Sequence, residues 1–246
     1  MHPIIHKKKA FYHTSGSLVK VYPLEVNLFN LKADYLPYDY ENTLKACQTG
    51  CNSYEHNGGC PPYSPDYRTL SAPYAYALIL YYKLYIRDLP EKPTTGYEYM
   101  HWTFTESFMP RLLLNTLISL AKRLSGYILS SGHCIGCKKC NFQKAEKICL
   151  KPDKRSYSLE AVGVNIVELM EKYSDSPIIW LEQGKEKSIP DYQLRVGAIL
   201  HNNRLTSGEQ EALLDVIYRR NLGKGDPTQN NTSSKELMRY QNKSSV

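Results

Sequence analysis

The chain has 246 residues, of which 42% are hydrophobic and 22% charged, and its formal net charge is +7. A chain of this length and composition can bury a sizeable core by itself, which excludes a disulfide-stapled miniature scaffold and a low-complexity segment. Its longest apolar stretch, residues 74–86, is shorter than the ~20 residues that a transmembrane helix needs. No apolar run follows the basic start of the chain, so we expect no secretory signal and a cytoplasmic location.

The first third of the chain favours strands, turns and loops. Residues 10–45 favour short strands and turns, and the tyrosine-rich segment 35–40 favours a loop. The apolar run Tyr76–Ile86 has the length of a buried central strand. Residues 88–96 contain two prolines and a glycine, which predicts a loop.

A helix is predicted next, from about Glu106 to Leu124, with Pro110 in its first turns. Leucines recur at helical spacing and should form its buried face: Leu113, Leu117, Leu120 and Leu124. Basic side chains on the other face can reach water: Arg111, Lys122 and Arg123. Residues 126–131 then favour a short strand.

Short elements are expected in the last third of the chain. Ser158 is placed to cap a short helix that Gly163 interrupts, and residues 167–173 favour a further turn or two of helix. Residues 178–181 and 194–200 favour strands.

The C-terminal part of the chain begins with a helix signal. Thr206 and Ser207 each start a capping box, and an apolar-periodic stretch follows at residues 212–222. We therefore expect one α/β domain over residues 1–222, a mixed sheet with flanking helices, and a basic, disordered tail over residues 223–246. Basic residues do not alternate with aromatic ones, so a nucleic-acid partner is not expected.

The strongest chemical signal is a run of four cysteines. It has the spacing C-x2-C-x2-C-x8-C-x2-P and consists of Cys134, Cys137, Cys140 and Cys149, followed by Pro152. Thiolates at such close spacing can wrap an iron–sulfur cubane, as in the ferredoxin motif, and Gly136 gives the backbone freedom to turn between ligands. Zinc is the alternative metal, but zinc sites usually draw on two separated ligand pairs. Buried structural cysteines are a third interpretation, which the interleaved lysines Lys138 and Lys139 disfavour.

A second group contains the remaining cysteines, Cys47, Cys51 and Cys60, with Pro61 and Pro62 after the last. In a reducing compartment such clusters indicate metal binding rather than disulfides. Seven cysteines divide into four and three, which predicts two [4Fe–4S] clusters held by loops at residues 47–62 and 133–152. The three-cysteine cluster would leave one iron open to a substrate or to another ligand.

Histidines beside the cysteines are candidates for the eighth ligand position. His56 lies between Cys51 and Cys60, and His133 directly precedes Cys134. The division of the cysteines is open too, because in two-cluster ferredoxins the fourth cysteine of a run ligates the other cluster, and Cys149 has that place here. Lys138 and Lys139 could offset the charge of an anionic cluster or dock an acidic electron donor, and they could equally be solvated surface residues.

The segment after the cysteine run carries a family resemblance. It reads Arg155-Ser-Tyr-Ser158-Leu-Glu160-Ala161-Val-Gly163-Val-Asn165. Joined to the early C-x3-C and C-P-P elements, it resembles an uncharacterised family described as predicted metal-binding proteins, whose pattern is C-x2-C-x2-C…C-x2-P…R-x-S-x-E-A-x-G-I-D-V. The match covers about residues 45–200. Ser156 lengthens the spacing between arginine and serine, and Asn165 stands where the family often has Asp. The resemblance implies metal binding and no particular reaction.

Candidate catalytic residues are Arg155, Glu160 and His56. Arg155 could hold a carboxylate or phosphate, and Glu160 could serve as a general acid or base. Both could instead fix the cysteine loop through contacts with the backbone or with each other. We expect a redox or cluster-dependent enzyme that meets a small-molecule substrate or an electron-transfer protein. The alternatives are a sulfur-transfer enzyme whose open iron binds sulfide, a ferredoxin-like electron carrier, and a zinc-stabilised binding module.

Overall fold

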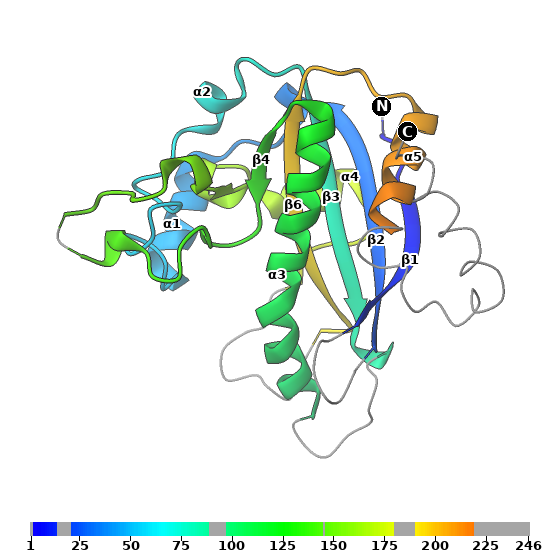
Figure 1. Cartoon of the computed structure of the whole chain (residues 1–246), viewed down its shortest axis with the longest axis horizontal. Helices are drawn as coiled ribbons and strands as arrows, with labels where there is room; N and C mark the ends of the chain where they lie inside the picture. The colour runs from blue at the N-terminus through cyan, green and yellow to red at the C-terminus, as the bar shows by residue number, and fades with distance from the viewer. Residues whose placement is uncertain (1, 14–20, 89–96, 145, 180–189, 219–246) are drawn as a thin grey trace, which may run out of the picture.

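A mixed sheet of six strands forms the centre of the molecule (Figure 1). The structure is a computed structural model, and it describes residues 2–13, 21–88, 97–144, 146–179 and 190–218. The strands are β1 (His6–His13), β2 (Val21–Lys32), β3 (Tyr76–Tyr85), β4 (Tyr127–Ser130), β5 (Tyr157–Ser158) and β6 (Tyr192–His201). Their spatial order is β1-β2-β3-β6-β4-β5. All neighbours pair antiparallel except β4 and β5, which pair in parallel.

Helices cover both faces of this sheet. They are α1 (Tyr40–Gly50), α2 (Tyr67–Ser71), α3 (Tyr97–Leu124), α4 (Ile166–Tyr173) and α5 (Ser207–Ile217). The buried residues of α3 and α5 share one hydrophobic core with β1, β2 and β3, and those of α4 belong to a second core on the opposite face. The predicted α/β fold, a mixed sheet with flanking helices, is thereby confirmed. No helix in the described ranges is long and apolar enough to cross a membrane.

Strand β3 confirms the predicted central strand. Leu78 and Leu80 point into the core under α3, whereas Ile79 and Tyr81 point into the other core, and all four side chains are fully buried. A strand that is covered on both faces needs apolar residues at consecutive positions, which explains the unbroken run in the sequence. The run ends one residue early, because Ile86 begins a 3-10 turn (Ile86–Asp88).

Helix α3 is longer than predicted. It begins at Tyr97 rather than near Glu106, so Pro110 lies inside the helix instead of in its first turns. A proline inside a helix costs about 3 kcal/mol or more, because it removes one backbone hydrogen bond and crowds the preceding turn. Packing of α3 against β4 and β6 outweighs this cost. Its end at Leu124 and its buried leucine face are confirmed.

Several shorter elements also differ from the prediction. The N-terminal segment forms two long strands instead of short ones, and a helix begins at Tyr40 because Asp39 accepts a hydrogen bond from the Asn42 N–H at 3.3 Å. Ile178 and Ile179 are not in a strand. The rest of that predicted strand, most of the predicted loop at 88–96 and the tail over 223–246 lie outside the described residues.

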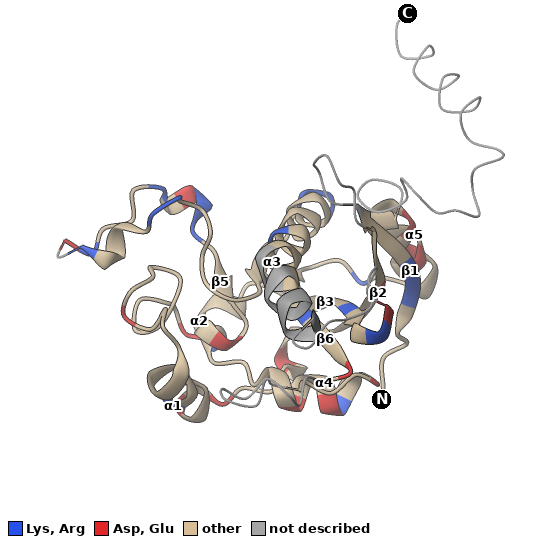
Figure 2. Cartoon of the chain, turned by 90° about the horizontal axis from the view of Figure 1, so that it is seen from below, with Lys and Arg blue, Asp and Glu red and all other residues tan. Residues whose placement is uncertain are grey.

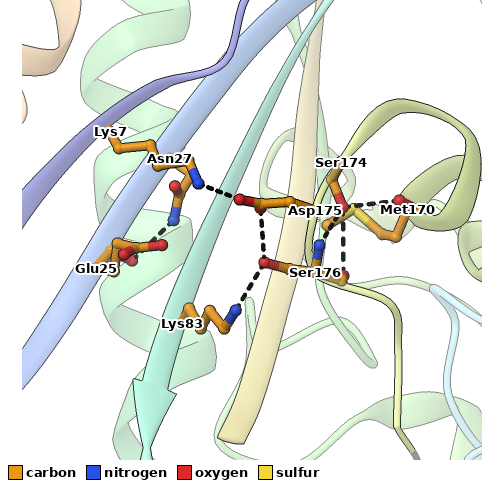
Figure 3. Close-up of polar contacts among 8 residues, drawn as sticks. All are labelled: Lys7, Glu25, Asn27, Lys83, Met170, Ser174, Asp175 and Ser176. Carbon is orange, nitrogen blue, oxygen red and sulfur yellow. Dashed lines mark hydrogen bonds and ion pairs between the residues drawn. The ribbon is translucent and has the colours of Figure 1, made fainter.

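A polar network fastens the chain after α4 to the sheet (Figure 3). The Asp175 carboxylate pairs with Lys7 of β1, and the Ser176 hydroxyl donates to Asp175 Oδ1 at 3.0 Å. Lys83 of β3 donates to Ser176 Oγ at 2.9 Å and lies over the Tyr192 ring at 4.2 Å. Ser176 is fully buried, so this lysine–serine pair cannot meet a substrate and serves the fold.

The start of α5 gives a testable stability effect. Of the two capping boxes in the sequence, Thr206 forms the box: its Oγ1 accepts from the Glu209 N–H at 3.3 Å, and Glu209 Oε2 accepts from the Thr206 N–H at 2.8 Å. Thr206→Ala should lower the free energy of unfolding by about 1 kcal/mol, as measured by urea unfolding. Thr206→Ser keeps the hydroxyl oxygen, so its free energy of unfolding should stay near that of wild type. Equal stability of all three proteins would show that the box contributes nothing.

Candidate metal centre

The first cysteine group spans a helix end and the turns after it. Cys47 lies in the last turns of α1, Cys51 is the residue that ends this helix, and Cys60 follows in a turn. The predicted loop at 47–62 is therefore helical in its first residues, because the Asp39 cap starts a helix that runs through Gly50. Cys60 is buried with 7% of its surface exposed, whereas Cys51 is exposed.

The second group lies on a long irregular segment between β4 and β5, residues 131–156, which we call the arm. The arm stands out from the same end of the sheet as α1 (Figure 1). Its regular structure in the described residues is two 3-10 turns, Asn141–Gln143 and Pro152–Lys154. Its half-buried cysteines are Cys134, Cys137, Cys140 and Cys149.

The fold brings the two cysteine groups together at Gly58 and Gly59. The Gly58 N–H donates to Cys140 Sγ at 3.4 Å, and Asn57 Nδ2 donates to the Cys134 carbonyl at 3.1 Å. A Cβ atom at Gly59 would lie 2.6 Å from Cys134 Cβ and 2.3 Å from the Ser156 carbonyl oxygen. Only a residue without a side chain permits this close approach of two backbone segments.

Arg155 connects the same two segments. Its Nε donates to the Gly58 carbonyl at 2.6 Å, and its Nη2 donates to the Tyr63 carbonyl at 2.5 Å. The guanidinium also lies 5.1 Å from the ring centre of Phe142 and 5.2 Å from that of Tyr157. Arg155 thus contacts backbone carbonyls. This contact corresponds to the second role considered for it, fixing the cysteine loop, rather than to substrate binding.

The thiols perturb one another electrostatically. Burial, then the neighbouring Cys51 and then Glu160 raise the pKa of Cys47 to about 11. Burial, together with Cys51, Cys47, Cys134 and Glu160, raises the pKa of Cys60 to about 12. Several thiolates at one place repel each other unless a cation compensates them, and a bound metal deprotonates its thiol ligands outright.

The donor set fits a metal group by its chemistry. Seven thiols lie in two segments that contact each other, and backbone N–H groups point at the sulfurs of Cys134 and Cys140, from Ser156 at 3.4 Å and Gly58 at 3.4 Å. Across the described residues, no three His, Cys, Asp or Glu side chains converge on the position of a single metal ion.

The motif after the arm has a structural explanation. Ser158 Oγ accepts from the Ala161 N–H at 3.1 Å and starts a 3-10 turn, Glu160–Val162. Gly163 ends that turn at a φ of +93°, which favours glycine. Asn165 then caps α4, with its Oδ1 accepting from the Glu168 N–H at 3.1 Å. Asn and Asp cap helices about equally well, so the departure from the family pattern costs this helix nothing.

A cavity of about 480 Å³ opens next to the arm. Its walls come from α3, the start of the arm, Glu160, α4 and the edge of β6. His133 and Glu160 both line it, so the structure brings these two predicted residues together. Arg155 does not line it, and neither does His56, which is exposed on the turn before Gly58.

The cavity residues that were not predicted from the sequence include two polar residues of β6, Gln193 and Arg195. Both lie in or next to the strand predicted at 194–200, where a charged residue in an otherwise apolar strand was the available signal. Arg195 acts electrostatically on Glu160: burial raises the pKa of the Glu160 carboxyl, and its own backbone N–H, Ser158 and Arg195 oppose that rise.

The close approach at Gly59 yields a stability prediction with an internal control. Gly59→Ala must separate the turn from the arm and should lower the free energy of unfolding by about 1–3 kcal/mol in urea unfolding under reducing conditions. Gly50→Ala is the control, because its Cβ would meet no atom within 4 Å and Gly50 is helical. The free energy of unfolding of Gly50→Ala should equal that of wild type or be slightly higher, because alanine favours a helix more than glycine does. A Gly59→Ala protein as stable as Gly50→Ala would refute the tight contact.

Comparison with known proteins agrees with the cysteine chemistry. No curated protein and no solved structure matched the chain. One family model, Predicted metal-binding protein (DUF2284), matches residues 30–199, which include all seven cysteines, the arm and the Arg155–Asn165 motif. The match covers more than half of the chain. The chain therefore belongs to the DUF2284 family of predicted metal-binding proteins.

Proposed function

We propose that this protein is an iron–sulfur protein with two [4Fe–4S] clusters, which acts as a redox or cluster-dependent enzyme. One cluster would be held by Cys134, Cys137, Cys140 and Cys149, and the other by the three cysteines of the first group. The observation that carries the proposal is the contact between the two groups at Gly58 and Gly59, which are far from the arm in sequence.

The donors favour a cluster over zinc for two reasons. Three thiols at C-x2-C-x2-C spacing suit a cubane, in which each binds a different iron. Backbone N–H groups from Gly58 and Ser156 reach the sulfurs of Cys140 and Cys134, and hydrogen bonds to sulfur are one of the means by which proteins set the reduction potential of a cluster. When bound, the clusters would supply electron transfer and, at the three-cysteine site, an iron open to a substrate.

The remaining residues position and enclose this centre. Arg155 fixes the arm to the turn before Cys60. The cavity begins at the residues that flank Cys134, namely His133 and Ile135, so a bound molecule would lie beside a ligand cysteine. Glu160 lines the same cavity and is the best-placed candidate for a general acid or base. A cavity of this size favours an enzyme over a pure electron carrier, which needs no substrate site.

Metal analysis tests the proposal directly. Anaerobically purified protein should contain about eight irons and eight acid-labile sulfides per chain, because each [4Fe–4S] cluster contributes four of each. Cys47→Ala and Cys137→Ala should each remove about half of the iron, and Lys45→Ala, an exposed residue of α1, should remove none. Cys149→Ala assigns that cysteine: electron paramagnetic resonance would show which of the two clusters its loss affects.

Two results would contradict the proposal. A wild-type count near four irons would remove the second cluster. A colourless protein that contains zinc and no sulfide would instead support a zinc-stabilised module.

The arm also has the properties of a docking surface for an acidic electron-transfer protein. It carries six lysines against two acidic residues, Glu146 and Asp153, and Figure 2 shows the basic residues along it. The side chains on either side of Cys149 are apolar and unusually exposed, with 58% of Ile148 and 70% of Leu150 accessible. Exposed aliphatic residues inside a basic surface favour a protein partner, which can bury them on binding. A nucleic acid would instead be bound through phosphate contacts or through bases stacked on aromatic side chains.

A binding titration tests this surface, with a reduced acidic [2Fe–2S] ferredoxin as the probe. At low salt, Lys138→Glu/Lys139→Glu should weaken binding about tenfold or more, because reversed charges repel an acidic partner. Ile148→Ser/Leu150→Ser should weaken it too, whereas Lys122→Glu on the exposed face of α3 should not. The docking surface is refuted if the probe does not bind, if Lys122→Glu has the same effect, or if a DNA oligonucleotide binds better than the ferredoxin.

A further inference from the structure

The cavity beside the arm lies at an edge of the sheet that no described strand covers. Strand β3 pairs with β6 from end to end, but β4 pairs only with residues 198–200 of β6 on the other side. After Ser130 the chain leaves the sheet to form the arm, and no strand of the described residues pairs with that edge of residues 193–196. The cavity occupies this place and is lined by those four residues of β6.

The walls of the cavity are mainly aliphatic. The apolar lining side chains come from α3, the arm, α4, the segment after α4 and β6: Pro110, Ile135, Ile166, Ile178, Ile179, Leu194 and Val196. The volume of about 480 Å³ falls in the usual range of small-molecule sites. Such walls favour a ligand with an apolar body.

The polar lining residues lie at three places: Gln193 and Arg195 at the edge of β6, Glu160, and Ser131 and His133 at the start of the arm. Arg195 is the permanent cation of the cavity, and its Nη1 donates to the Leu194 carbonyl at 2.9 Å, which orients the guanidinium along the strand edge. Gln193 accepts from Thr105 of α3, a bond that fixes its amide. Glu160 lines the same cavity; burial raises the pKa of its carboxyl, and the nearby Arg195 opposes that rise.

We propose that this cavity binds an organic carboxylate with an apolar body, with Arg195 as the residue that recognises the carboxylate group. The planar guanidinium matches the geometry of a carboxylate, and the aliphatic walls receive the rest of the molecule. The cavity places such a ligand between β6 and the residues that flank Cys134. The identification of this ligand as the substrate rests on the proposed iron–sulfur function, but its binding does not.

Matched pairs of small molecules test the site in the full-length protein. The probes are isovalerate and 3-phenylpropanoate, each compared with its neutral amide by ligand-observed NMR titration. Wild type should bind at least one carboxylate about tenfold more tightly than its amide. Arg195→Gln should abolish this preference while amide binding persists, and Arg204→Gln, an exposed arginine that does not line the cavity, should keep it.

A second variant guards against a folding defect in Arg195→Gln. Ile179 lines the cavity and is 44% exposed, so Ile179→Glu should fold normally. Its negative charge should weaken the binding of the carboxylates more than the binding of the amides. The proposal is overturned if wild type shows no preference for any carboxylate, or if both variants preserve the preference. Iron content measured on the same samples separates the two proposals. An iron-free protein that still prefers carboxylates would refute the iron–sulfur clusters and support the carboxylate site. An iron-loaded protein without that preference would refute the carboxylate site alone.

Discussion

The contact between the arm and the turn at Gly58 holds the candidate metal centre together. Arg155 donates to two carbonyl groups of that turn region, and the backbones approach so closely at Gly59 that a side chain would collide. Both acceptors are backbone atoms, whose positions are fixed by the chain course rather than by rotamers. The distance between the two cysteine groups is therefore set by a backbone contact that one guanidinium stabilises.

The sheet explains why this centre and the cavity lie side by side. Strand β4 has only four residues, and the arm leaves from its end and returns to the parallel strand β5. Because β4 is short, part of the edge of β6 has no neighbour among the described strands, and the cavity lies there. One feature, the early end of β4, thus produces both the arm that carries four cysteines and the space that a small molecule could enter.

Local patterns predicted much of the fold. The apolar run of β3, the leucine spacing at the end of α3 and the capping box of α5 each depend on residues that are close in sequence, so periodicity and capping chemistry revealed them. The start of α3 was missed because packing against the sheet overrides the tendency of Pro110 to begin a helix. The helix that carries Cys47 was missed because the glycines and prolines nearby favour turns.

The sequence by itself determined the donor set and the family of this protein: seven thiols at spacings that suit metal groups, and a pattern that matches a family of predicted metal-binding proteins. Only the tertiary structure decided which of those residues meet. It placed Arg155 against backbone carbonyls of the turn, left His56 away from the cavity and brought Arg195 to it. Ligand spacing is a property of a short segment, whereas contacts between distant residues depend on how the strands pair, and no local pattern records that pairing.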